Sequence, residues 1–384
     1  MRVLFVAEYF PLCPAGAFEI TGGVESVALG SAQWLAQNHD VRAVTNYRCG
    51  PAAMRVGRLE VVQCGHHGRY TQKGGLLGRA SFQREAIARG VEFRPDVVVG
   101  WNFVSYAPAY RIARRCGVPA VAWYADVWVG RWLRLFGLAG ILGELLERRV
   151  LRQHWDHFIA ISDWTRSLLQ ARGIKPTDIA IIPPIVDVPA NLMSERVKQT
   201  DRSVDEMELV TVSRLVTYKR VDVLISAFAR LAARWPSLRL TVIGAGAEKR
   251  RLERLAAREG VAGRIQWRGW LREHSEVLSV VAAAALYASA SEVEGFGIAT
   301  VEAAALGVPY VVADIPAVRF ATRGGQGGFL FPPGNVRACA EAMERLLKDR
   351  DLRKRKGTEG RELAQLYRPE VIGPQFEDVL KSLV

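Results

Sequence analysis

The 384-residue sequence has few of the residues that form disulfides in small secreted proteins or bind metals: it has five cysteines and six histidines. The cysteines are odd in number, widely spaced, and never form a C-x-x-C pair, which favours a reducing compartment over a disulfide framework or a cysteine-based zinc site. The histidines form no set with metal-ligand spacing, so we expect no metal. The cysteines are Cys13, Cys49, Cys64, Cys116 and Cys339.

Long apolar runs are also missing. The longest uncharged stretch near the middle of the chain, 277–291, has 15 residues, whereas a membrane-spanning helix needs about 20. Glu8 interrupts the apolar start of the chain, so no signal-peptide core forms. We therefore expect a cytoplasmic protein that is soluble or that lies peripherally on the inner face of the membrane.

The chain is basic and long enough for two domains. It has 52 lysine and arginine residues against 39 acidic ones, a formal charge of +13, and 49% of its residues are hydrophobic. This hydrophobic content excludes intrinsic disorder, and the length suits two α/β domains of roughly 150–200 residues each. Both halves are basic and no charged tail is present. The charge therefore indicates an anionic partner such as a phosphate-bearing small molecule, a membrane surface or nucleic acid.

Buried-strand patterns alternate with helical patterns along the sequence. Runs that are wholly or mainly apolar, for example 3–7, 97–99, 238–243 and 310–312, are separated by stretches with helical spacing. This arrangement is typical of parallel sheets covered by helices on both faces, so we predict an α/β fold. Two prolines followed by a polar stretch without apolar periodicity mark a boundary. The predicted segments are a first domain at 1–189, a linker at 190–206 and a second domain at 207–365.

The block 294–303 carries the strongest chemical signal. Glu294 and Glu302 stand eight residues apart with a Gly-Phe-Gly turn between them, and the pattern predicts a helix that begins near Ile298. A helix N-terminus directs backbone N–H groups and the positive end of its dipole at an anion. Glu302 could bind vicinal hydroxyls such as those of a ribose, and Glu294 those of a sugar ring. The alternatives are that Glu302 only complements the helix dipole and that Glu294 is a solvated loop acid.

A second block places two cations after a predicted strand. Arg214 and Lys219 stand five residues apart between the strand 209–212 and the helix 221–232. Ligands of open α/β sheets bind at the carboxyl ends of strands, where these cations would neutralise a diphosphate. At an effective dielectric constant of about 20, one such contact contributes roughly 4 kcal/mol before desolvation. The alternative is that both are ordinary surface cations.

Two glycine pairs give weaker signals. Gly22-Gly23 lies between a strand and a helix, where the backbone could approach a phosphate or a sugar, or simply turn. Gly244 and Gly246 follow a strand as in a dinucleotide-binding fingerprint, but Lys249 stands where the third glycine belongs. We therefore expect no nicotinamide binding.

Together these motifs, in this order, resemble glycosyltransferase family 4, the retaining nucleotide-sugar transferases of the GT-B fold, over nearly the whole chain. The chain departs from that family at Ser213, where glycine is usual, and at Ala125, where histidine often precedes Asp126. The motifs that carry the resemblance are Gly-Gly-Val-Glu at 22–25, Ser-Arg-Leu at 213–215 with Lys219, the strand end 242–246, the E-x7-E block 294–302 and the glycine loop 324–334.

The resemblance implies two Rossmann-like domains facing each other across a cleft, with a C-terminal helix, 366–384, that returns to the first domain. It also implies a role for each motif. The donor diphosphate would be bound by Arg214, Lys219, Gly23, Phe296, Gly297 and Ile298, the ribose by Glu302, and the base by Trp270 and Leu271. The catalytic residues would be Glu294, which holds the transferred sugar, and Asp126 on the acceptor side.

The reaction implied is the transfer of a hexose, with retention, from a UDP- or GDP-linked sugar to a hydroxyl acceptor. The departing phosphate would take the acceptor proton, so the reaction would require neither a metal nor a resident cofactor. Two other classes stay open: a GT-B protein that binds sugar nucleotides without activity, and a basic nucleic-acid-binding protein. The sequence has no nucleic-acid recognition motif and no clustered charge, so we expect no nucleic-acid partner.

A segment after Asp126 interleaves aromatic residues with arginines. Three tryptophan or phenylalanine residues and two arginines lie between 128 and 136, and the apolar character continues to Leu142. Such a segment could dock on an anionic lipid surface, where each basic residue contributes about 1 kcal/mol, or form a helix packed against the first domain. The basic loop 66–75 has the polar composition of an acceptor loop. We therefore expect a lipid-linked or polysaccharide acceptor.

Overall fold

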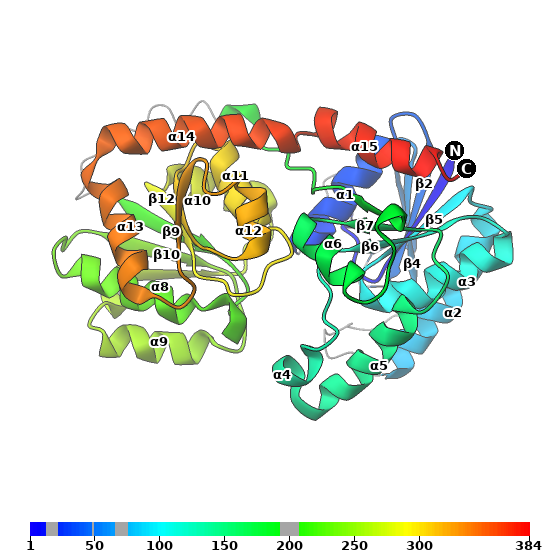
Figure 1. The fold of residues 1–384 in the computed structure, drawn as a ribbon, viewed down its shortest axis with the longest axis horizontal. Helices are drawn as coiled ribbons and strands as arrows, with labels where there is room; N and C mark the ends of the chain where they lie inside the picture. Colours follow the sequence, from blue (N-terminus) through cyan, green and yellow to red (C-terminus); the bar gives the residue numbers. More distant parts are fainter. Residues whose placement is uncertain (13–21, 48–49, 66–75, 193–206) are drawn as a thin grey trace. The chain divides into compact units, whose positions relative to one another are not determined.

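The computed structural model describes residues 1–12, 22–47, 50–65, 76–192 and 207–384, and it divides the chain into two units (Figure 1). Unit 1 comprises Met1–Ile185 and Pro369–Val384, and unit 2 comprises Val186–Arg368. The sequence-based bounds were 1–189, 207–365 and 366–384. The predicted linker lies outside the described residues from 193 onward, as does the whole of the proposed acceptor loop, 66–75.

Unit 1 is built on an eight-stranded sheet. Its strands are β1 (Arg2–Ala7), β2 (Asp40–Asn46), β3 (Ala53–Val56), β4 (Leu59–Cys64), β5 (Val97–Trp101), β6 (Ala120–Tyr124), β7 (His157–Ala160) and β8 (Ile179–Ile181). They lie in the order β3-β4-β2-β1-β5-β6-β7-β8 and pair in parallel, except that β3 runs antiparallel to β4. Because β1 lies inside the sheet, its apolar run is buried on both faces.

Helices supply the cover for both faces of this sheet. The helices of this unit are α1 (Gly23–Leu35), α2 (Leu76–Phe93), α3 (Tyr106–Cys116), α4 (Trp132–Phe136), α5 (Gly140–Leu151), α6 (Asp163–Gln170) and α15 (Pro369–Lys381). Leu4 shares a core with residues of α2 and α3. Phe5 instead contacts Trp101, with ring centroids 5.4 Å apart, and Phe376 of α15 at 6.2 Å. Successive strand residues point to opposite faces, so the single run 3–7 supplies both cores.

The C-terminal helix α15 packs against α1 within unit 1. Glu377 accepts a hydrogen bond from Nε1 of Trp34 at 3.3 Å, and its Oε1 lies 2.9 Å from Nε2 of His39 and 2.6 Å from Nζ of Lys381. The hydrogen bond from Lys381 holds the pKa of Glu377 below its ordinary value despite burial. Gly373 is needed where α15 crosses the ring of Trp34, because a Cβ there would overlap the indole.

Unit 2 contains a six-stranded sheet in which every neighbouring pair is parallel. Its strands are β9 (Glu208–Val212), β10 (Arg239–Ile243), β11 (Ile265–Gly269), β12 (Leu286–Ser289), β13 (Tyr310–Ala313) and β14 (Gly328–Phe331). The strand order is β11-β10-β9-β12-β13-β14. One hydrophobic core of this unit lies between the strands and residues of the helices that follow β9, β10 and β14. The helices are α8 (Val221–Ala232), α9 (Lys249–Arg258), α10 (His274–Ala283), α11 (Ile298–Ala305), α12 (Pro316–Ala321), α13 (Val336–Lys348) and α14 (Arg350–Ala364).

The described part of the chain shows neither a disulfide nor a metal-ligand cluster nor a membrane-spanning helix. Cys64, Cys116 and Cys339 are free thiols there, and Cys13 and Cys49 lie outside it. No three histidine, cysteine, aspartate or glutamate side chains in these ranges converge as metal ligands would. None of the helices in these ranges combines the length and apolar character needed to cross a membrane.

Candidate functional site

In unit 2 the candidate residues lie at the carboxyl edge of the sheet. β9 pairs in parallel with β12, so the loop that follows β9 and the loop that follows β12 leave the sheet at the same edge. The first of these loops, 213–220, carries both predicted phosphate ligands. The second, 290–297, carries Glu294 and ends at α11. Ligands of open α/β sheets bind at this edge.

Ion pairs and a backbone hydrogen bond tie the two loops together. Nζ of Lys219 lies 2.6 Å from Oε1 of Glu294. Arg220 pairs with Glu292, and the Glu292 N–H donates to the carbonyl of Tyr218 at 2.9 Å. Arg220 caps the start of α8 in the left-handed conformation, with φ at 46°, and it also contacts Asp222 at 3.1 Å. The structure thus brings together Lys219 and Glu294, which we had predicted for different parts of the donor.

Arg214 lies on an exposed part of the same loop, with its guanidinium 2.7 Å from the hydroxyl of Tyr218. The backbone beneath it packs closely against the end of β10. The Ser213 N–H donates to the carbonyl of Ile243 at 3.0 Å. A Cβ on Gly244, whose φ is +130°, would overlap the Ser213 carbonyl. This glycine therefore has a structural reason unrelated to dinucleotide binding: it lets the Arg214 loop approach the strand.

The turn before α11 positions the helix N-terminus. Gly297 caps the helix with φ at 99°, a conformation that favours glycine. Phe296 is buried, and its ring packs edge-on against Tyr367 and Phe320, with centroids 5.1 and 6.3 Å away. α11 begins at Ile298 as predicted. The first N–H groups of a helix have no carbonyl partner within it, so this anchored turn can present them to an anion.

Glu302 is buried in α11 and is held by a histidine that the sequence did not single out. Its Oε1 lies 3.0 Å from Nε2 of His274. Burial lowers the pKa of His274, but the negative charge of Glu302 and the hydrogen bond to it outweigh burial and raise that pKa above its ordinary value. Beneath them, burial and the charges of Glu294 and Glu302 raise the pKa of Tyr287. Both glutamates therefore lie close to one buried phenol.

The two predicted base-binding residues follow β11. Trp270 has 49% of its surface exposed, and Leu271 is half-buried. The carbonyl of Gly269, immediately before them, accepts a hydrogen bond from the Gly244 N–H at 2.7 Å. This contact joins the end of β11 to the end of β10, at the same sheet edge as the Arg214 loop. An exposed indole at this position offers a flat face for stacking.

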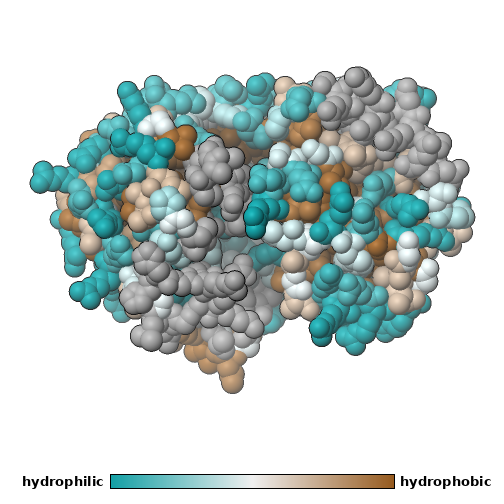
Figure 2. All heavy atoms as spheres, turned by 180° about the vertical axis from the view of Figure 1, so that it is seen from behind, coloured by the Kyte–Doolittle hydropathy of each residue, from teal (hydrophilic) through white to brown (hydrophobic). Residues whose placement is uncertain are grey.

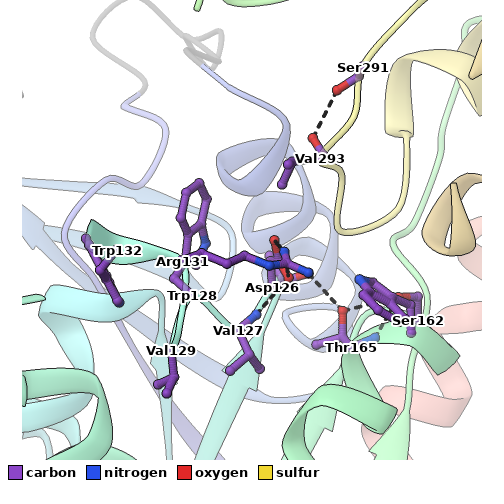
Figure 3. Close-up of polar contacts among 12 residues, drawn as sticks. Asp126, Val127, Trp128, Val129, Arg131, Trp132, Ser162, Thr165, Ser291 and Val293 are labelled. Carbon is purple, nitrogen blue, oxygen red and sulfur yellow. Dashed lines mark hydrogen bonds and ion pairs between the residues drawn. The ribbon is translucent and has the colours of Figure 1, made fainter. Parts of the chain in front are cut away.

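In unit 1, Asp126 follows β6 and has 7% of its side-chain surface exposed. Figure 3 shows it beside Arg131. Its carboxylate accepts hydrogen bonds from the Val127 N–H at 2.8 Å and from Nη1 of Arg131 at 3.1 Å. The preceding residue, Ala125, accepts a hydrogen bond at its carbonyl from Oγ1 of Thr165 at 3.0 Å. Thr165 belongs to the first turn of α6, whose N-cap is Ser162. Asp126 is thus a fixed, paired carboxylate.

Gly23 is the first residue of α1, and Gly22 caps the helix in an extended conformation. A Cβ on Gly22 would meet no heavy atom within 4 Å. The surroundings of Gly22 therefore do not by themselves demand glycine, in contrast to those of Gly244. The role predicted for Gly23 stays a prediction.

Three residues that contact the predicted site residues were not predicted from the sequence. Arg220 and Glu292 flank the predicted pair Lys219 and Glu294, and their adjacency to two predicted residues was the available signal. His274 gave no signal, because its link to Glu302 spans a loop, a helix and a strand. Local spacing does not reveal partners of this kind.

Two family models match the chain, one in each half. The glycosyltransferase family 4 model matches residues 21–189, and the model of glycosyl transferases group 1 matches residues 194–363. The E-x7-E block and the Arg214 loop lie within the second match, and Gly23 and Asp126 lie within the first.

Known glycosyltransferases and related enzymes are similar to this chain in sequence and in structure. A glycogen synthase of Mycobacterium tuberculosis is 26% identical over 72% of this chain and 66% of its own length. The chain spans less than two thirds of the length of the curated relatives it matches. A sucrose-phosphate synthase structure from Thermosynechococcus elongatus has a TM-score of 0.85 at 20% identity and covers 100% of this chain and 98% of its own. An Anabaena protein solved with UDP and glucose has a TM-score of 0.77 at 18% identity, with 100% of both chains covered. These likenesses confirm the predicted GT-B fold.

Proposed function

The chain belongs to the glycosyltransferases, with a family 4 domain followed by a group 1 domain, and we propose that it is a retaining hexosyltransferase that uses a nucleotide diphosphate sugar. The observation that carries this proposal is the group at the carboxyl edge of the unit 2 sheet. There Lys219 and Glu294 are paired at 2.6 Å in the loops that lead to α8 and α11. A cation, two carboxylates and a helix N-terminus in one place match the charges and hydroxyls of a sugar nucleotide.

On the donor side, each group has a proposed task. Arg214, Lys219 and the N–H groups of 296–298 neutralise the diphosphate, as does the backbone at Gly23, and no metal or resident cofactor takes part. Glu302 binds the ribose, and the hydrogen bond from His274 fixes its orientation. Glu294 binds the transferred sugar, while Trp270 and Leu271 flank the base. We propose a UDP- or GDP-linked sugar, and the Anabaena protein of the same fold, which binds UDP and glucose, supports this choice.

The proposed chemistry is transfer with retention. The acceptor hydroxyl attacks the anomeric carbon from the side of the leaving group, the bond from that carbon to the phosphate oxygen breaks, and the departing phosphate takes the acceptor proton. Lys219 and Arg214 would stabilise the negative charge that develops on the diphosphate. Asp126 would orient the acceptor hydroxyl, since its own position is fixed by Arg131.

The acceptor is proposed to be lipid-linked or a polysaccharide, and the site of action the cytoplasm, with the protein peripheral on an anionic membrane surface. The formal charge of +13 favours such a surface. A protein that binds sugar nucleotides without transferring the sugar is the alternative, since Ala125 stands where the family often has histidine.

A thermal-shift panel with UDP, GDP and ADP sugars tests the proposal. A ligand at 100 times its Kd stabilises the folded state by about 2.7 kcal/mol, and we expect one base to stabilise the protein far more than the others. Glu294→Ala should reduce the additional shift given by the sugar. Stabilisation by no nucleotide overturns the proposal. Stabilisation without transfer or donor hydrolysis, in the presence or absence of EDTA, favours the non-catalytic alternative.

A further inference from the structure

Exposed apolar side chains concentrate in one short segment of unit 1. Of the ten large hydrophobic residues that are exposed in the described part of the chain, six lie between 133 and 146. Leu138 has 83% of its surface exposed. We call this set the leucine patch. Its members are Leu133, Leu138, Ile141, Leu142, Leu145 and Leu146.

The patch covers α4, α5 and the short helical turn between them, η2 (Gly137–Ala139). Figure 2 shows hydrophobic side chains gathered at the lower edge of the molecule, where this segment projects. Single exposed leucines are ordinary on protein surfaces, but a contiguous group marks an interaction surface. The segment therefore differs in kind from the remainder of the described surface.

Internal contacts hold the patch in its outward orientation. Trp132 turns back onto α5, where its indole Nε1 donates to Glu147 at 2.6 Å and its ring lies against Gly143, which has no side chain to obstruct it. The centroid of the Phe103 ring lies 4.9 Å from that of Trp132. The tryptophan thus faces the unit, and the aliphatic residues face solvent. This arrangement combines the two alternatives left open by the sequence: Trp132 packs inward and the leucines are exposed for docking.

Positive charge surrounds the patch. Arg134, Arg148, Arg149 and Arg152 are exposed on or next to the same helices. Of the two acidic residues of α5, Glu147 is buried, whereas Glu144 accepts a hydrogen bond from the Gly130 N–H at 2.7 Å and pairs with Arg148 at 2.7 Å. We therefore assign Arg134, Arg149 and Arg152 to the headgroup phosphates. Aliphatic side chains bordered by arginines match a bilayer surface of anionic phospholipid, in which acyl chains receive the leucines and headgroup phosphates pair with the guanidinium groups.

We propose that the leucine patch and its arginines dock this protein on an anionic phospholipid bilayer, and that the acceptor is therefore anchored in lipid. The second part rests on the proposed transferase function, whereas the first part does not. α5 also holds the acceptor-side loop, because Glu147 accepts a hydrogen bond from the Trp128 N–H at 3.1 Å. The element that docks on lipid thus also supports the loop that begins at Asp126.

Vesicle co-sedimentation of the full chain tests the docking. We expect binding to vesicles of phosphatidylcholine and phosphatidylglycerol, and weaker binding to phosphatidylcholine alone. Leu138→Gln/Leu145→Gln, which alters only exposed side chains, should lower the partition coefficient at least roughly tenfold. Its matched control is Val56→Gln/Val371→Gln, two exposed aliphatic residues elsewhere in unit 1. The control should bind like the wild type.

The charge is tested separately. Arg134→Gln/Arg149→Gln should lower binding to anionic vesicles about 30-fold at low salt, since each basic residue near the surface contributes about fivefold. Arg111→Gln/Arg115→Gln makes the same change of charge on α3 and should have a much smaller effect. Equal effects of the two pairs, or equal binding to charged and uncharged vesicles, overturn the proposal.

Two further measurements distinguish lipid docking from self-association and from donor binding. If the wild type does not bind vesicles but self-associates, and the leucine variant is monomeric in analytical ultracentrifugation, the patch binds a second copy and the proposal is wrong. The thermal shift with UDP sugars is measured on the same samples. Nucleotide stabilisation without vesicle binding removes the docking proposal and the proposed membrane location, and it leaves the proposed transfer from a nucleotide sugar intact. Vesicle binding without nucleotide stabilisation does the reverse.

Discussion

Nζ of Lys219 lies 2.6 Å from Oε1 of Glu294, so one ion pair joins two motifs that are 75 residues apart in the sequence. Both side chains are mostly shielded from solvent, with 13% and 22% of their surfaces exposed. A donor diphosphate that binds here would share Lys219 with Glu294. The pair thus couples the proposed phosphate site to the proposed sugar site.

Lys219→Gln is expected to weaken UDP binding at least roughly tenfold, because a charge-assisted hydrogen bond contributes about 1.5–3 kcal/mol. Glu294→Gln should change UDP affinity little but lower sugar transfer strongly. Isothermal titration calorimetry and a transfer assay separate the two effects. Lys249→Gln, on the exposed start of α9, serves as the control. If the Lys219 variant binds UDP as tightly as the control does, Lys219 is not a phosphate ligand.

His274 should make the stability of unit 2 depend on pH. The pKa of His274 is raised in the folded state by Glu302, although burial opposes this. Protonated His274 therefore stabilises the folded state. This contribution is present in full below the unfolded-state pKa of 6.5, and it is lost as the pH rises through the pKa of the folded state. Urea denaturation from about pH 5.5 to about pH 9 should show a steeper loss for the wild type than for His274→Gln. Parallel curves would contradict the assignment.

Gly244→Ala should disturb the Arg214 loop without touching any proposed ligand. The new Cβ would overlap the Ser213 carbonyl in a backbone conformation, φ +130°, that L-residues rarely adopt. We expect a loss of roughly 2–4 kcal/mol in the free energy of unfolding and weaker UDP binding. Gly263→Ala, where a Cβ meets nothing within 4 Å, is the matched control. A wild-type midpoint for Gly244→Ala in a urea titration would disprove the close packing.

Glu147 should destabilise unit 1 as the pH rises. Burial raises its pKa from 4.5 to about 7, although hydrogen bonds from Trp132 and Trp128 oppose the rise. The contribution of neutral Glu147 to the free energy of unfolding is therefore present in full below pH 4.5. It is lost as the pH rises through about 7, by at most about 3 kcal/mol. Glu147→Gln should flatten the wild-type stability curve over this window. Glu92→Gln, an exposed acid on α2, should follow the wild type, and a Glu147→Gln curve that also does so would refute the prediction.

Asp126→Asn should affect the acceptor and not the donor. Its carboxylate is fixed by Arg131 and the Val127 N–H, and the variant keeps the shape of the side chain while removing its charge. We expect transfer to slow at least roughly tenfold with unchanged UDP affinity. Asp163→Asn, at the exposed start of α6, is the control. Loss of UDP binding in the Asp126 variant would show that its role is not confined to the acceptor.

Much of the fold could be predicted from local sequence. The run 3–7 is apolar at every position, and only a strand buried on both faces accommodates such a run. The helix 221–232 was predicted with the bounds that α8 has, because its apolar spacing and its flanking loops agree. The start of α11 at Ile298 followed from the Gly-Phe-Gly turn. These features depend on residues that are close together in the sequence, so the local pattern of apolar residues and glycines predicts them.

By itself, the sequence determined the parallel α/β class, the strand ends that carry Arg214 and Glu294, and the motifs that resemble one enzyme family. Only the tertiary structure decided which partners these residues meet: Lys219 for Glu294, His274 for Glu302 and Arg131 for Asp126. It also decided that Trp132 faces the unit while Leu138 and Leu145 face solvent. The physical reason is that periodicity shows which residues share a face of an element, whereas the packing of distant elements determines whether that face is covered.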